Sequence, residues 1–483
     1  MGAPLPISLG TGSNKGRYGQ DGVAEFVNCY AEQLGEGGKV QFPIYAINGK
    51  EQFATLPLGG GIRAMLTVDN TLLALSGRIL FKTDAYANSI TAVGGIPSDG
   101  FVTMARNRQS PNPQVVIVCD GAWFVYQAGV LTPGNDSDLP APICVVEFNG
   151  YFVFLIADGR WFISGVDNTE IDGLDFTTAN ISPDQNVMAG VRGRELVIFG
   201  KNSTQFYVEG GSGDFPFSLV QAISIGCYAA GSVAKIILQP GGYSATDSLI
   251  WAATDHKGGY AGLMVLSGYS GQKISTPEID QLIIAEADPT AIRAFAWTED
   301  GHSFYCINGT SFSRCWDSNT GKWHTLKSSG LNRWRMSCHA QINQEHIFGD
   351  YAANLLYRSN ASLYTENGNP IIAQVVTPPV HMFPSSFKVN TFWLDVLTGV
   401  GVTGGADQDS SPQFMLDYSD DGGATFGGLR HVNLGSDAQR YVSCDERGFG
   451  RFGPNGVSFR MTFSAAVAKG LMQASIDATK LGA

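Results

Sequence analysis

Hydrophobic and polar residues alternate with a period of two along most of this chain. In 204–209 ("TQFYVE"), Phe206 and Val208 share one face, whereas Gln205, Tyr207 and Glu209 share the other. The segments 63–68 ("RAMLTV") and 78–82 ("RILFK") alternate in the same way. A period of two is typical of a β-strand with one buried face. The sequence therefore predicts many short strands and almost no helix.

A few strands lack a polar face. In 195–200 ("ELVIFG"), four consecutive apolar residues predict a strand that is covered on both sides. Between the strands, Asn-Gly and Asp-Gly pairs favour tight turns, because these residues tolerate a positive φ. Such pairs begin, among other places, at residues 120, 149, 158, 300, 308, 367 and 455.

The groups of strands recur about every 40 residues, which is the length of one four-stranded propeller blade. They begin near Ile62, Phe101, Ile143, Val187, Ser232, Ile292 and Arg335. One such group cannot bury both of its faces alone, but groups stacked radially can. We therefore expect an irregular β-propeller of about six or seven blades in residues 53–368. A pair of β-sandwiches, which needs no radial repeat, is the alternative.

The two ends of the chain differ from this repeat. After Pro370 the expected strands are longer, and residues 369–483 predict a separate antiparallel β-sandwich. Residues 1–52 show no blade pattern and are expected to form an N-terminal arm and a first strand. Their "GTGSNKG" stretch (10–16) has the composition of a mobile or clasping arm. The expected fold class is thus all-β throughout.

Composition narrows the possible functions. Charged residues make up 15% of the chain, against roughly 25% in an average soluble domain, which favours a surface partly hidden in an assembly. The net charge of -12 argues against tight nucleic-acid binding, because such binding needs Lys and Arg to neutralise phosphates. An acidic wall would still let a DNA duplex pass without holding it.

Cysteine usage and the N-terminus bear on the compartment. Eight cysteines are dispersed without a CxxC pair, and we expect them to be reduced and mostly buried. The N-terminus "MGAPLPISLG" lacks the features of a signal peptide. The longest apolar run, 151–157, is far shorter than the ~20 residues of a membrane helix, so no membrane insertion is expected.

The stretch "DNTEIDGLDF" (167–176) packs four carboxylates into ten residues, and Asp184 follows it. It fails the EF-hand pattern, because Thr169 and Ile171 occupy ligand positions. Paired carboxylates in acid–base catalysis need a supporting polar shell, which the local sequence does not supply. Since Asp, Asn and Gly form turns with their own backbone, we interpret the stretch as an ordered loop between blades.

Other motifs carry equally little chemistry. His302 with Cys306 and Cys315 could meet on neighbouring strands, as could Cys338 with His339 and His346, but a zinc site usually takes four ligands in tight pairs. Core or interface positions are expected for both groups. The stretch "SDDGGATF" (419–426) matches the Asp box of sialidases, where it shapes a hairpin away from the catalytic site. We expect no catalytic residue, no cofactor and no metal ion.

Several short motifs occur in a characteristic order and are together more specific than any one of them. They are "VNCYAE" (27–32), "WFISGVDNTEIDGLDFTTANISPDQ" (161–185), "GRELVIFGKNSTQFYVEGG" (193–211), "FPF" (215–217), "IGC" (225–227), "ISTPEID" (274–280), "GHSFYCI" (301–307), "WDSNTGKWH" (316–324) and "DYSDDGGATF" (417–426). In this order they resemble the packaged-DNA stabilisation proteins, or tail hub (nozzle) proteins, of short-tailed bacteriophages. The segments 42–50 and 399–413 depart from that pattern.

The resemblance implies a structural virion protein and not an enzyme. Such proteins form a sixfold ring below the portal and its adaptor, help to retain packaged DNA, and form part of the ejection channel. Implied partners are further copies of the chain, the portal adaptor, a tail needle or plug, and a tailspike or tail fibre. Packaged double-stranded DNA would pass through without sequence-specific binding. The implied location is the virion tail, after assembly in the bacterial host cytoplasm. A glycan-binding or sialidase-like propeller of a phage tail is the alternative.

Overall fold

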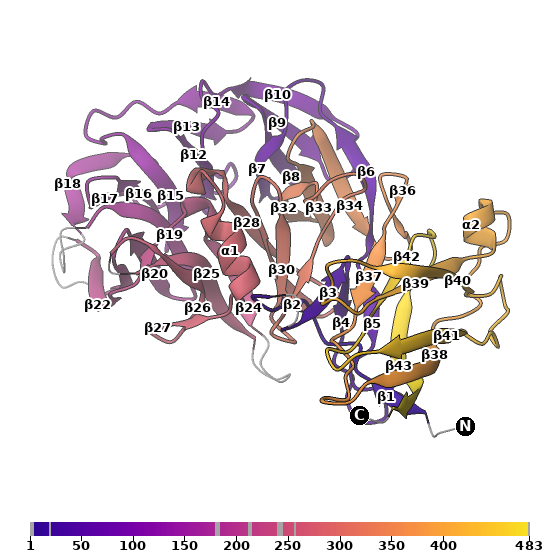
Figure 1. The fold of residues 1–483 in the computed structure, drawn as a ribbon. Helices are drawn as coiled ribbons and strands as arrows, with labels where there is room; N and C mark the ends of the chain where they lie inside the picture. The colour runs from indigo at the N-terminus through magenta and orange to yellow at the C-terminus, as the bar shows by residue number, and fades with distance from the viewer. Residues whose placement is uncertain are drawn as a thin grey trace.

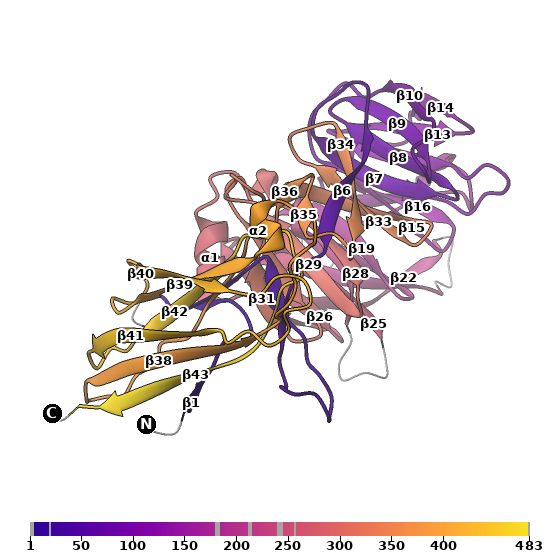
Figure 2. The ribbon, with the colours of Figure 1, turned by 90° about the vertical axis from the view of Figure 1, so that its right-hand side faces the viewer.

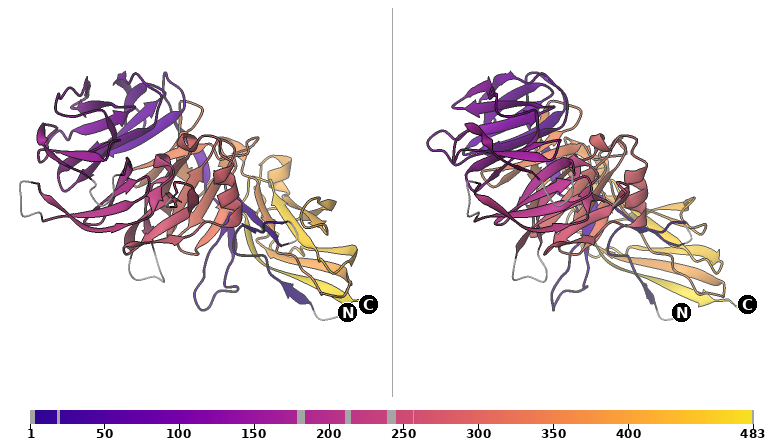
Figure 3. Two further views of the ribbon diagram at one scale, coloured as in Figure 1. Left: turned by 60° about the vertical axis from the view of Figure 1, so that its left-hand side comes forward. Right: turned by 90° about the vertical axis from the view of Figure 1, so that its left-hand side faces the viewer.

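The computed structural model describes residues 4–18, 21–178, 184–210, 215–238, 245–255 and 257–481. Its larger part is a β-propeller, which Figure 1 shows with the innermost strands gathered around the middle. Its smaller part is a β-sandwich that projects from one side of the propeller (Figures 2 and 3).

Seven blades are formed by the described residues. Blades 1 to 4 each consist of four consecutive antiparallel strands, ordered from the innermost outward. They are β7 (Ile62–Val68), β8 (Thr71–Ser76), β9 (Ile79–Asp84) and β10 (Ile90–Gly95); β11 (Val102–Arg106), β12 (Val115–Cys119), β13 (Ala122–Gln127) and β14 (Val130–Pro133); β15 (Pro142–Phe148), β16 (Tyr151–Ile156), β17 (Arg160–Ser164) and β18 (Ile171–Thr178); β19 (Asn186–Arg192), β20 (Glu195–Gly200), β21 (Thr204–Glu209) and β22 (Phe217–Ile223).

Blades 5 to 7 depart from this simple order. Blade 5 carries an extra short strand, blade 6 is regular, and blade 7 takes its outer strand from the N-terminal part of the chain. Their strands are β23 (Gly226–Cys227), β24 (Ala234–Leu238), β25 (Thr246–Thr254), β26 (Tyr260–Ser267) and β27 (Ser270–Lys273); β28 (Arg293–Glu299), β29 (His302–Asn308), β30 (Ser313–Asp317) and β31 (Lys322–Thr325); β32 (Met336–Ile342), β33 (Glu345–Asp350), β34 (Leu355–Asn360) and β6 (Gly49–Thr55).

The ring closes between the last blade and the first. Each innermost strand lies beside that of the next blade, and β32 of blade 7 lies beside β7 of blade 1. The Thr67 hydroxyl donates to the Gln341 carbonyl, 2.8 Å away, across this closing junction. Strand β6 pairs antiparallel with β34, so residues far apart in sequence complete blade 7. The expected domain boundary at residues 52/53 falls within β6.

Each expected strand group begins within two residues of an observed innermost strand. The fold class, an all-β chain with a propeller, is confirmed.

The seven-bladed ring also explains one wrong expectation. Gln205 and Tyr207 are buried, with 2% and 4% of their surface exposed, although the alternation predicted a polar face. The cause is that neighbouring blades cover both faces of β21, and the Tyr207 hydroxyl donates to Gln205 Oε1 at 2.7 Å.

The sandwich combines strands from both ends of the chain. One sheet contains β3 (Val23–Val27), β37 (Ala373–Val376), β42 (Ser458–Phe463), β39 (Gln413–Ser419) and β40 (Gly427–Asn433), with β2 (Asn14–Lys15) beside β3. The other contains β4 (Cys29–Ala31), β5 (Ile44–Ala46), β43 (Gly470–Lys480), β38 (Phe387–Val396) and β41 (Asp445–Phe452), with β1 (Leu5–Ile7) beside β43.

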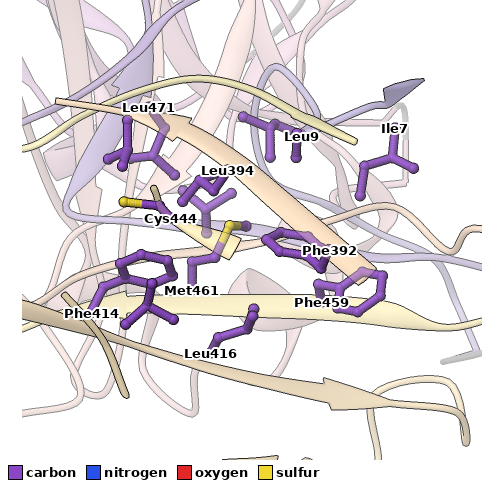
Figure 4. Packing of buried hydrophobic residues seen from close by; sticks show 14 of the residues in the cluster. Ile7, Leu9, Phe392, Leu394, Phe414, Leu416, Cys444, Phe459, Met461 and Leu471 are labelled. Carbon is purple, nitrogen blue, oxygen red and sulfur yellow. The ribbon is translucent and has the colours of Figure 1, made fainter. Parts of the chain in front are cut away.

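The core between these two sheets contains residues of the expected N-terminal arm. Ile7 and Leu9 pack in the same apolar cluster as Phe392, Phe459 and Met461 (Figure 4). The segment 10–16 is held against blade 6, because Ser13 N donates to the Trp323 carbonyl at 2.6 Å. The N-terminal segment is therefore built first into the sandwich and then, through β6, into blade 7.

The propeller and the sandwich share a continuous sheet. Strand β31, the outer strand of blade 6, pairs in parallel with β3 through Thr325 and Val27. Asn28, which has φ +53°, ties this junction together. Its Nδ2 donates to the carbonyls of Lys327 (2.8 Å) and Ile372 (2.9 Å), and its Oδ1 accepts from Lys327 N (2.9 Å).

Short elements complete the fold. They are the helices α1 (Pro277–Ile284) and α2 (Asp407–Ser410), the 3-10 turns η1 (Ala230–Ser232) and η2 (Pro289–Ala291), and the strands β35 (Thr365–Glu366) and β36 (Asn369–Pro370). Helix α1 and turn η2 link blades 5 and 6. Within the described ranges, no helix is long and apolar enough to span a membrane.

Candidate functional site

The carboxylate-rich stretch 167–176 lies within blade 3, which corrects the expectation of a loop between blades. Its first residues form the turn after β17, and the rest forms the outer strand β18, because Phe176 pairs with Phe162. Asp167 Oδ1 accepts from Arg108 N at 3.1 Å, and Asp172 Oδ1 accepts from Leu174 N at 2.9 Å. Asp172 therefore orders a local turn, as the composition of the stretch predicts, whereas Asp167 links its turn to the segment after β11 of blade 2.

Asp184 has a related role in blade 4. Its Oδ2 accepts from Ser203 N (2.8 Å), Ser203 Oγ (2.9 Å) and Asn202 N (2.9 Å). The side chain is 7% exposed. Asp184 thus holds the turn between β20 and β21, and its acceptor capacity is used within the protein.

The residues of the first candidate metal group, His302, Cys306 and Cys315, make separate contacts in the core of blade 6. Cys306 and Cys315 are cross-strand neighbours in blade 6, and both are fully buried. Burial raises the pKa of the Cys306 thiol to about 12, whereas zinc binds the thiolate. His302 Nδ1 instead lies 3.0 Å from Asp317 Oδ2. Burial lowers the pKa of His302, but the hydrogen bond and the charge of Asp317 raise it by more.

The residues of the second candidate metal group lie on opposite faces of β32, because Cys338 and His339 are consecutive in this strand. Cys338 lies next to blade 1, with Sγ 3.7 Å from the Ile62 carbonyl, while His339 Nε2 lies 3.0 Å from His346 Nδ1. Burial, and then the charge of His346, lower the pKa of His339 to about 3. Among the side chains that the structure describes, no three or more His, Cys, Asp or Glu residues form a group that could hold a metal ion.

All eight cysteines lie in the described part of the chain and are free thiols, and seven are buried.

The Asp box forms a hairpin turn at the end of β39. Asp421 Oδ2 accepts from the Thr425 hydroxyl at 2.6 Å, and Asp421 Oδ1 accepts from Thr425 N at 3.0 Å. These hydrogen bonds lower the Asp421 pKa to about 2.

The most distinctive cluster lies at the mouth of the propeller channel, on the face where the innermost strands begin. Arg293 opens β28 in blade 6, and Phe101 precedes β11 in blade 2, across the ring axis. The guanidinium carbon of Arg293 lies 4.9 Å from the centre of the Phe101 ring. This contact therefore crosses the ring between two blades that are not neighbours. The sequence offered no signal for the pairing, because 192 positions separate the two residues.

A second arginine reinforces the mouth. Arg63 Nη1 donates to the carbonyls of Gly77 (2.8 Å) and Ser98 (2.9 Å), and Nη2 donates to the Gly100 carbonyl. Burial, and then the charge of Arg63, lower the pKa of Arg293. Beside the Arg293–Phe101 contact lies a pocket of about 410 Å³, which extends to Lys201 and to residues 227–231.

A family model described as "Bacteriophage P22 Gp10, beta-propeller" matches residues 27–362. The chain belongs to this phage stabilisation family. The matched range begins at the end of β3 and ends just after β34, so it covers all seven blades that the described residues form. The resemblance in the ordered motifs is thereby confirmed, and the protein is a phage DNA-stabilising tail protein and a structural component of the virion.

Other comparisons add little to the phage stabilisation family. No curated protein matches the sequence. Among solved structures, BamB from Moraxella catarrhalis aligns with a TM-score of 0.38 and 8% identity, over 64% of this chain and 98% of that chain. The WD40 propeller domain of Doa1 aligns with a TM-score of 0.37 and 11% identity, over 64% and 96%.

Proposed function

We propose that the protein forms a sixfold ring, the tail hub or nozzle, below the complex of portal and adaptor. In that place it helps to retain the packaged genome and forms part of the channel through which DNA leaves. The observation that carries this proposal is the match of the phage stabilisation family to residues 27–362. The ring assembles in the host cytoplasm and contacts the adaptor, a needle or plug, and a tailspike or fibre.

The contact at the channel mouth favours a DNA conduit that is formed between copies of the chain and not within one propeller. Arg293 and Phe101 reach across the ring from blades 6 and 2 and are in contact at 4.9 Å, so the space between them is filled by their own side chains. A duplex therefore cannot thread one propeller. A ring of copies can enclose a wider space, and the net charge of -12 lets DNA move along its wall without strong binding.

Quantitative mass spectrometry of purified virions tests the proposal by counting this chain against the portal protein. In a particle with a twelvefold portal, a sixfold ring gives one copy of this chain for every two portal subunits. Any other ratio contradicts the sixfold ring, and absence from the particle contradicts the tail-hub function.

Glycan binding remains a second candidate, favoured by a groove of about 690 Å³ beside the Asp-box hairpin. Lys15, Glu25, Asp421 and Phe426 line it, and Lys15 Nζ lies 2.8 Å from Glu25 Oε1. A panel of labelled glycans tests this candidate. Saturable binding that Phe426→Ala abolishes would support it, and the absence of both binding and hydrolysis would eliminate it.

A further inference from the structure

Two arginines at the channel mouth form no ion pair with the described residues. Among the residues that the structure describes, neither Arg63 nor Arg293 has a carboxylate oxygen within 4.0 Å, whereas most other arginines form ion pairs. Both guanidinium groups are half-buried and carry permanent charge. Two like charges held near each other raise the energy of the free protein. An anion bound between or beside them would lower it.

The nearby carboxylates accept hydrogen bonds from backbone N–H groups. Asp120 Oδ2 accepts from Gly100 N at 3.1 Å. Asp288 Oδ1 accepts from Thr290 N at 2.8 Å and from the Thr290 hydroxyl at 2.7 Å. Asp184 holds the turn at Asn202 and Ser203. These carboxylates stay charged, and the charge of Asp288 raises the pKa of Arg293 against the effect of burial. Arg293 Nη1 donates to the carbonyls of Thr290 and Ile292, the latter at 2.8 Å. The remaining N–H groups of the Arg293 guanidinium can bind a further acceptor.

The pocket beside Arg293 has a mixed character. Its lining includes two cationic residues, Arg293 and the exposed Lys201. Phe101, Val187 and Tyr228 supply an apolar wall. A volume of about 410 Å³ lies within the usual range of ligand pockets, roughly 300–1,000 Å³. A ligand that fits this pocket must bring a negative group and apolar atoms side by side.

We propose that this mouth pocket binds an acidic polypeptide segment of a partner protein, with an Asp or Glu carboxylate on Arg293 and Lys201 and an apolar side chain on Phe101 and Val187. The geometry favours a peptide over a nucleic acid. A DNA strand spreads its charge along a backbone and is bound by cations along a groove, whereas here Arg293 and Lys201 line one pocket together with apolar side chains. The inference does not depend on the proposed ring.

Saturation-transfer NMR on the purified full-length chain tests this inference. The probe is the peptide acetyl-Leu-Glu-Leu-amide, and the matched control peptide carries Gln in place of Glu. We expect transfer to the Glu peptide, little transfer to the Gln peptide, and a loss of the signal at high salt. Equal transfer to both peptides, or to neither, overturns the proposal.

Variants locate the site. Arg293→Gln and Lys201→Gln are each expected to weaken binding of the Glu peptide by about tenfold, the loss of one charge-assisted hydrogen bond. Lys201 lies on an exposed turn, so K201Q keeps the test valid if R293Q fails to fold. Arg293→Lys should retain most of the binding, and Lys388→Gln on the sandwich should retain all of it. Unchanged binding in K201Q and R293Q overturns the assignment.

Competition identifies the class of ligand. Inorganic phosphate and the oligonucleotide (dT)4 are added at the concentration of the peptide. We expect neither to displace it. Displacement by phosphate would show a general anion site, and displacement by (dT)4 would show a nucleic-acid site, and either outcome overturns the commitment to a peptide.

Discussion

Arg293 in blade 6 packs its guanidinium against the ring of Phe101 in blade 2, at 4.9 Å across the mouth of the channel. Cation–π contacts contribute about 0.5–2 kcal/mol, depending on how far they are desolvated. A double-mutant cycle of Phe101→Leu and Arg293→Gln should therefore give a coupling energy of about 1 kcal/mol in urea denaturation. The same cycle with Lys388→Gln in place of R293Q is the control. A coupling no larger than that of the control would contradict a stabilising contact between Arg293 and Phe101.

Ile198 tests the central position of β20. The side chain is 1% exposed and lies in the cluster between blades 3 and 4. Ile198→Asp buries an unpaired charge and should lower the free energy of unfolding by at least about 3 kcal/mol. Ile198→Val, which only removes a methylene group, should cost about 1 kcal/mol. A soluble I198D protein with normal stability would rule out the strand assignment.

Asn28 tests the junction between propeller and sandwich. Asn28→Ala removes three hydrogen bonds. It also leaves an alanine, which disfavours the left-handed region, at φ +53°. We expect a loss of about 2–4 kcal/mol in the free energy of unfolding. Asn28→Gly tolerates the positive φ, so it should cost about 1 kcal/mol less than N28A.

The matched control for Asn28 is Asn343→Ala. Asn343 is exposed in the turn between β32 and β33 and has φ +48°. Its substitution should cost only the conformational strain, about 1 kcal/mol. Equal losses in N28A and N343A would show that the Asn28 hydrogen bonds do not stabilise the junction.

His324 makes stability depend on pH. Burial lowers its pKa to about 4, with the charges of Asp317 and His302 acting in opposite directions. An unfolded histidine has a pKa near 6.5, so the unfolded chain binds a proton that the folded chain excludes. The stabilising effect of the neutral ring is complete above pH 6.5 and is lost as the pH falls toward 4.

The measurement is urea denaturation at pH 7 and pH 5. From these two pKa values, the native protein should lose about 2 kcal/mol through His324 between the two conditions. Between the two pH values, the His324→Phe variant should lose about 2 kcal/mol less unfolding free energy than the native protein, because Phe does not titrate. The ring of Phe suits the site, which is lined by Tyr30 and Phe304. His381→Phe on the exposed surface is the control. A pH dependence unchanged in H324F would contradict a neutral buried ring.

Much of the fold follows from local patterns. The alternation in 63–68 and the apolar run 196–199 depend only on which side chains can face a core, and both segments are strands. The spacing of the strand groups predicts the seven observed blade starts, because each blade must bury two faces against its neighbours. The hydrogen bond from Leu174 N to Asp172 Oδ1 is also local, whereas Asp167 accepts from Arg108 N, which is 59 residues away.

Only the tertiary structure decided the rest, because it depends on residues that are distant in sequence. Tyr207 alternates like a surface residue, yet a neighbouring blade buries it. Strand β6 shows no blade pattern, but its backbone groups complete the sheet of blade 7. Arg293 and Phe101 meet because ring closure brings blades 2 and 6 across one axis. The sequence alone thus determined strands, turns and repeat length, which arise from neighbouring residues, whereas ring closure determined burial, shared sheets and the channel mouth.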